Sequence, residues 1–89
     1  MEARNIPVQM IAYCDAEGEM KPLRFRYEDD RHRIHTVRVQ QVVDRRTVEF
    51  VGIQALLILC KSMEEDREHL YELKYTVATH KWTLFRKVY

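Results

Sequence analysis

The feature that most constrains this chain is the strict alternation of apolar and polar residues between residues 71 and 77, which read YELKYTV. Successive side chains of a β-strand point to opposite faces, so this pattern predicts a strand with one buried and one solvated face. The same period recurs at residues 6–14, 23–27 and 33–43. In residues 23–27 it places Leu23, Phe25 and Tyr27 on the inner face and two arginines on the outer face.

Polar runs separate these segments and predict the turns between them. DAEGE (15–19), EDDRH (28–32) and KSMEEDRE (61–68) are such runs. Residues 44–47 are expected to form a short connection, and residues 48–60 a strand bent or bulged at Gly52 with both faces buried. We therefore predict one small, mainly β domain over residues 1–89. Its expected architecture is five or six antiparallel strands in meander order, forming a curled sheet or a small barrel.

One segment has an alternative interpretation. Within residues 54–73, Leu56, Leu59 and Met63 also fit a helical spacing, and the residues around Met63 include strong helix formers. A helix there would place the charged Asp66 on the apolar stripe. It would also not account for the alternation after residue 70. The strand interpretation is therefore favoured.

Composition limits the class of protein. The 89 residues are 46% apolar and 33% charged with a net charge of +1, which is typical of a globular domain. The longest apolar run, residues 55–60, is far shorter than the roughly 20 residues of a membrane span. No export signal is expected at the N-terminus. Two isolated cysteines, Cys14 and Cys60, are then expected to be free thiols in a reducing cytoplasm.

The residues that could carry chemistry do not form a catalytic or metal-binding pattern. His32 and His35 make an HxxH that follows three acids, but residues three apart on a strand point to opposite sides, so no metal site is predicted. Cys14 and Cys60 have no spacing that pairs them with a histidine base, and a buried thiol is the favoured interpretation. With two glycines, the chain also lacks a phosphate-binding loop. No enzyme and no cofactor are expected.

The candidate binding surface is basic. If residues 20–28 and 33–43 pair as a hairpin, Arg24, Arg26 and Arg38 share an outer face, and Arg33 lies at the turn. Arginine suits bidentate contact with phosphate, so this ribbon is a candidate nucleic-acid surface. The alternative is that these arginines pair with Glu72 and other acids on adjacent strands, or that they only keep a sheet edge soluble. Aromatic residues that would stack on bases are expected in the core instead; they are Phe25, Tyr27, Tyr71, Tyr75 and Trp82.

Three strings carry a resemblance: PLRFRYED from residue 22, YELKY from residue 71 and KWTLFRK from residue 81. In these strings the chain resembles short bacterial domains of unknown function, of Firmicutes and actinobacterial type. The resemblance implies a β-rich domain without an assigned activity. It also implies that the protein is an accessory to DNA repair. It transfers no catalytic residue.

Three classes of function follow. The first is a non-catalytic interaction module that associates with itself, as a homodimer, or with another protein. The second is an accessory protein that contacts nucleic acid through the arginine ribbon. The third is a small barrel that binds a ligand in a cavity lined by Tyr27, Tyr71, Tyr75 and Trp82.

Overall fold

The computed structural model describes residues 3–88, which form eight antiparallel strands and no helix. Strands hold 74% of the residues, which confirms the mainly β class predicted from the alternation. The strands are β1 (Ala3–Pro7), β2 (Gln9–Cys14), β3 (Met20–Glu28), β4 (Ile34–Arg38), β5 (Gln41–Phe50), β6 (Ile53–Glu64), β7 (Arg67–Thr76) and β8 (Lys81–Lys87).

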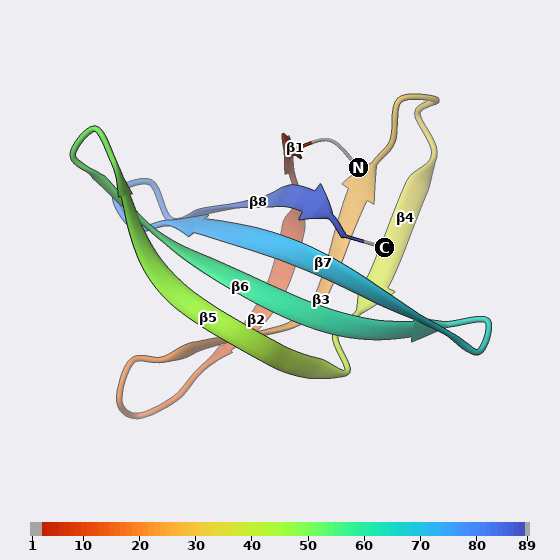
Figure 1. Ribbon diagram of the computed structural model, residues 1–89, viewed down its shortest axis with the longest axis horizontal. Helices are drawn as coiled ribbons and strands as arrows, with labels where there is room; N and C mark the ends of the chain where they lie inside the picture. Colours follow the sequence, from red (N-terminus) through yellow and green to blue (C-terminus); the bar gives the residue numbers. More distant parts are fainter. Residues whose placement is uncertain (1–2, 89) are drawn as a thin grey trace.

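The strands form two curled sheets that do not close into a barrel. One sheet has five strands in the order β1-β8-β7-β6-β5, and the other has three in the order β2-β3-β4. Figure 1 shows β2, β3 and β4 running across β5–β8 at a steep angle. Within each sheet, β2-β3-β4 and β5-β6-β7-β8 follow the predicted meander order.

The strand number exceeds the predicted five or six because the chain changes sheet within two predicted strands. The first change is at Val8, whose N–H donates to the Trp82 carbonyl of β8 at 3.2 Å. The second lies between Val39, whose N–H donates to Leu23 of β3, and Gln40, whose N–H donates to Lys61 of β6. Each change divides one alternating segment between two sheets.

The β5–β6 connection corrects the prediction of one bent strand over residues 48–60. Val51 and Gly52 form a two-residue hairpin turn between the paired residues Phe50 and Ile53, with φ values of 49° and 83°. Two positive φ values are the pattern of a type I′ turn, which suits antiparallel hairpins. Residues 44–47 belong to β5 and are not a connection. The helix considered for residues 54–73 is replaced by β6 and β7.

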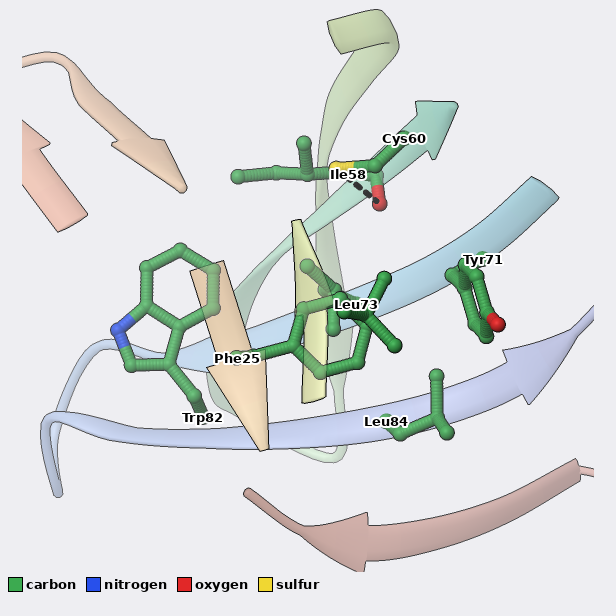
Figure 2. Packing of buried hydrophobic residues seen from close by; sticks show 8 residues of the cluster. Phe25, Ile58, Cys60, Tyr71, Leu73, Trp82 and Leu84 are labelled. Atoms are coloured by element: carbon green, nitrogen blue, oxygen red, sulfur yellow. Dashed lines mark hydrogen bonds between the residues drawn. The ribbon is translucent and has the colours of Figure 1, made fainter. Parts of the chain in front are cut away.

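The core lies between the two sheets. Figure 2 shows Phe25 of β3 facing side chains of β6, β7 and β8, among them Ile58, Leu73 and Leu84. Phe25 is 1% exposed, and its ring meets Tyr71 edge to face with 5.5 Å between the centroids. The Trp82 ring is 4.9 Å from that of Tyr75, its partner on β7. The inward placement predicted for these aromatic residues is confirmed.

Strand β6 is an interior strand of the larger sheet, paired with β5 and β7, and is buried on both faces, as its continuous apolar run predicted. Ile58 and Cys60 face the core, while Ala55 and Leu57 are buried on the opposite face. Among residues 3–88, no helix has the length and apolar character needed to cross a membrane.

Candidate nucleic-acid interface

The outer face of the three-stranded sheet is built on the alternation of β3. Phe25 enters the core, whereas Arg24 and Arg26 on either side of it are exposed. The register places Arg24 opposite Arg38 of β4, and Arg26 opposite Thr36. We call this surface, with Arg24, Arg26 and Arg38 on it, the arginine face. The structure thus brings together the three arginines that the sequence placed on one face.

The charges of the arginine face are not neutralised by acids. None of the ion pairs formed within residues 3–88 involves Arg24, Arg26 or Arg38. Arg26 donates from Nε and one Nη to the Gln9 amide oxygen of β2, at 3.2 and 3.1 Å, and this neutral contact orients its guanidinium. Arg24 and Arg38 are directly opposed like charges, an arrangement that destabilises a bare sheet. An anion bridging the two guanidiniums would relieve this repulsion.

Two shallow hollows cross this surface. One of about 320 Å³ has Gln9, Ile11, Arg24, Arg26 and Thr36 in its lining. A second of about 190 Å³ is lined by Ile11, Leu23, Arg24 and Arg38. Because they share Ile11 and Arg24, the hollows adjoin, and together they extend over all three strands.

Apolar side chains lie beside the arginines. Ile11 is opposite Arg24 and is 51% exposed, and Tyr13 of the same strand is 55% exposed. Leu23 is also exposed, because a shift in register between Ile11 and Ala12 leaves it unpaired. This corrects the prediction that Leu23 shares the inner face with Phe25. The arginine face therefore offers cationic groups and apolar surface side by side.

Sequence reasoning missed the contribution of β2. The alternation put Gln9, Ile11 and Tyr13 on one side of their strand, and the meander order predicted that this strand pairs with β3, but neither gave the register of the pair. The register of two strands depends on contacts between distant residues, so no local signal identifies Gln9 as the partner of Arg26.

Arg33 does not lie on the arginine face. It precedes Ile34, and it lines a separate cleft of about 400 Å³ whose walls include Tyr27, His35 and Leu84. The cause is parity: residues 34, 36 and 38 point outward, so residue 33 points to the other side. The prediction that Arg33 joins the other three arginines is therefore wrong.

The proposed pairing of the arginine face with Glu72 is also wrong. Glu72 is a buried acid on β7 of the other sheet. Its carboxylate accepts a hydrogen bond from Arg86 Nε at 2.9 Å and lies 3.7 Å from an Arg46 nitrogen. Glu72 thus neutralises arginines of its own sheet and is not available to the three-stranded sheet.

The two histidines of the HxxH each contact a different acid. His32 Nδ1 is 2.9 Å from Glu28, and His35 Nε2 is 2.7 Å from Asp29. The hydrogen bond from His35, together with the backbone N–H of Arg33, lowers the pKa of Asp29 to about 2. Within residues 3–88, no three metal-type ligands gather into a site.

Of the two thiols expected to be buried, Cys60 is buried, but Cys14 at the end of β2 is exposed, so the prediction is wrong for Cys14. Burial raises the pKa of the Cys60 thiol to about 12, so the thiolate that a nucleophile requires does not form near neutral pH. Tyr71 donates its hydroxyl hydrogen to Glu64 at 3.0 Å, and burial with this hydrogen bond raises its pKa. Burial, and the nearby charges of Glu64 and Asp29, also raise the pKa of Tyr27.

No family model, no curated protein and no solved structure matches the chain. The resemblance to short bacterial domains therefore stays a prediction.

Proposed function

We propose that this protein is a non-catalytic interaction module that binds single-stranded nucleic acid on its arginine face. The observation that carries the proposal is the direct opposition of Arg24 and Arg38 without an acidic partner. Guanidinium groups bind phosphate oxygens in a bidentate manner, and a phosphate between two arginines removes the repulsion between them.

The spacing of the arginines suits a chain of phosphates. Arg24 and Arg26 are two residues apart on β3, which corresponds to about 7 Å along a strand. Arg38 lies across from Arg24 at the interstrand distance of about 5 Å. Three cationic groups over this area could contact successive phosphates of one strand.

The apolar neighbours favour a single strand over a duplex. Exposed Ile11 and Tyr13 provide surface for unstacked bases, and aromatic side chains bind bases without sequence preference. A duplex presents its phosphates outward and keeps its bases stacked inside, so it would leave these side chains without a partner.

The proposal includes a cytoplasmic location and, from the resemblance, an accessory role in DNA repair. Both cysteines are free in the structure, Cys14 exposed and Cys60 buried, which is consistent with a reducing compartment.

The test is binding of a fluorescent oligonucleotide, single-stranded DNA and RNA separately, measured by anisotropy over a series of salt concentrations. For three phosphate contacts, the logarithm of affinity should fall against the logarithm of salt with a slope of about −2. Replacement of Arg24, Arg26 and Arg38 by Gln should abolish binding and leave the melting temperature almost unchanged, because exposed charges contribute little to stability.

A matched control removes the same charge elsewhere. Arg31, Arg67 and Lys81 are exposed and lie outside the arginine face, so their replacement by Gln should leave most of the affinity in place. The proposal is wrong if the wild-type protein binds none of these oligonucleotides at low salt, or if binding survives the substitutions on the arginine face. Tighter binding to a duplex with a slope near −3 would refute the single-strand assignment.

A further inference from the structure

Strand β5 forms a long free edge of the five-stranded sheet. Nine of its ten residues pair with β6 on one side, and no described strand pairs with the other side. Figure 1 shows β5 as the outermost strand of that sheet. An edge of this length exposes a row of N–H and C=O groups, which are a template for pairing with another strand. The other edge of this sheet is β1, which has only five residues, and β8 is covered by β1 and β7.

Exposed apolar side chains lie at both ends of this edge. Val43 is 49% exposed near its start, and Phe50 is 48% exposed at its end. Val51 at the hairpin tip is fully exposed, and Ile53 begins the next strand exposed. Val51 also holds a positive φ of 49°, which is unfavourable for a β-branched residue. An unfavourable backbone conformation and an exposed apolar side chain at the same residue indicate a surface that contacts another protein chain.

We propose that β5 pairs with β5 of a second copy of this chain, antiparallel, about a two-fold axis at Thr47. A two-fold axis perpendicular to the sheet keeps every side chain on its own face. Residues that oppose each other must therefore both be odd-numbered or both even-numbered, and one residue opposes its own copy.

Charge selects the register among these arrangements. An axis at Arg45 or Arg46 would place an arginine opposite its own copy, which is unfavourable. An axis at Thr47 places Arg45 of each copy opposite Glu49 of the other and forms two ion pairs. Glu49 takes part in none of the ion pairs within residues 3–88. Arg45 donates from one Nη to the Met20 carbonyl at 2.8 Å, which leaves its other donors for Glu49.

The same register also covers the apolar ends. Val43 of one copy falls opposite Val51 of the other, so each hairpin tip lies against the start of the opposing strand. The register with β6 shifts between Val42 and Asp44, and this bulge ends the regular pairing at that point. The result is a continuous sheet of ten strands across the two copies. The arginine faces lie on the other sheet of each copy and stay exposed.

Position 47 provides a test because it opposes itself. Thr47 is exposed, so Thr47→Glu and Thr47→Lys should leave the fold intact while placing two like charges on the axis. We expect the wild-type protein to be a dimer at micromolar concentration by light scattering. Each variant alone should associate more than roughly tenfold more weakly, because opposed like charges disfavour an interface. An equimolar mixture of the two variants should recover the dimer as a heterodimer, seen in native mass spectrometry.

A matched pair of substitutions and a measurement on the wild-type chain complete the test. Thr79→Glu and Thr79→Lys, at an exposed turn away from β5, should leave the dimer unchanged. If the variants at position 47 do not fold, hydrogen exchange of the wild-type protein decides: backbone amides of β5 should gain protection as concentration rises. A monomeric mass over roughly a hundredfold range of concentration would overturn the proposal. Dimers that persist in both variants, or a mixture that stays monomeric, would overturn it as well.

Discussion

Truncation of Phe25 to Ala tests the packing that joins the two sheets. Phe25 is the largest side chain that the three-stranded sheet buries completely, at 1% exposure. It contacts Tyr71 edge to face and is stacked beside Tyr27 at 6.2 Å. Removal of its ring leaves a cavity between β3 and β7, which the two hydrogen-bonded sheets cannot close without moving relative to each other.

The expected cost is large for a chain of this size. A buried Phe→Ala substitution costs about 3–5 kcal/mol, and this includes the loss of the aromatic pair with Tyr71, about 0.5–1.5 kcal/mol. At about 0.05–0.15 kcal/mol per residue, an 89-residue domain has roughly 4–13 kcal/mol of stability in total. The variant should therefore melt at least about 12 °C lower than the wild type, and it should be largely unfolded if the total is at the low end.

Urea denaturation, followed by the fluorescence of Trp82, measures this loss. Arg24→Ala is the control, because Arg24 lies next to Phe25 on the exposed face of the same strand; it should change stability by no more than about 0.5 kcal/mol. A loss below about 1 kcal/mol for Phe25→Ala would refute the reasoning, because it would mean that the two sheets do not depend on this contact.

Three further perturbations have defined outcomes. At pH 8, iodoacetamide should label the exposed Cys14 but not Cys60, because burial raises the pKa of the Cys60 thiol to about 12. Both cysteines should react in urea. Two labels on the folded protein would contradict the burial of Cys60. The pKa of Asp29 is lowered to about 2 by its hydrogen bond with His35, so its carboxylate stabilises the fold above its unfolded pKa of about 3.9, and this contribution is lost as the pH falls from about 4 to about 2. Asp29→Asn should accordingly flatten the fall in urea-unfolding stability between pH 5 and 2, and parallel curves would show that the hydrogen bond is absent in solution. At a protein concentration too low for dimerisation, Val51→Asn should raise the free energy of unfolding by about 1 kcal/mol, because Asn tolerates the positive φ at this turn and Val51 has no packing within its own copy to lose; lower stability would argue against the turn conformation.

Much of the fold follows from local pattern. Alternation in residues 23–27 and 71–77 identified strands and assigned Phe25, Tyr71 and Tyr75 to the inner face, because a period of two depends only on strand geometry. The outward parity of Arg24, Arg26 and Arg38 had the same origin. The apolar run of β6 also predicted an interior strand buried on both faces.

The sequence did not reveal where the chain leaves one sheet for the other. The alternation runs through Val8 and through Val39 without interruption, so a single strand and two strands in different sheets have the same local pattern. Backbone hydrogen bonds with β8 and β6, which are distant in sequence, decide the change. Leu23 is a similar case: its exposure follows from a bulge against β2 that no residue in its own strand requires.

By itself, then, the sequence determined the strand class, the two faces of each strand and the outward direction of the arginines, since these are properties of neighbouring residues. Tertiary structure alone decided where the chain leaves one sheet for the other and in which register the strands pair. It set Arg24 opposite Arg38, brought Gln9 to Arg26, moved Arg33 to a different cleft and left β5 as a free edge. The physical reason is that strand pairing is a contact between segments far apart in the chain. Its register is selected by the burial of a whole face, and not by the propensity of any one residue.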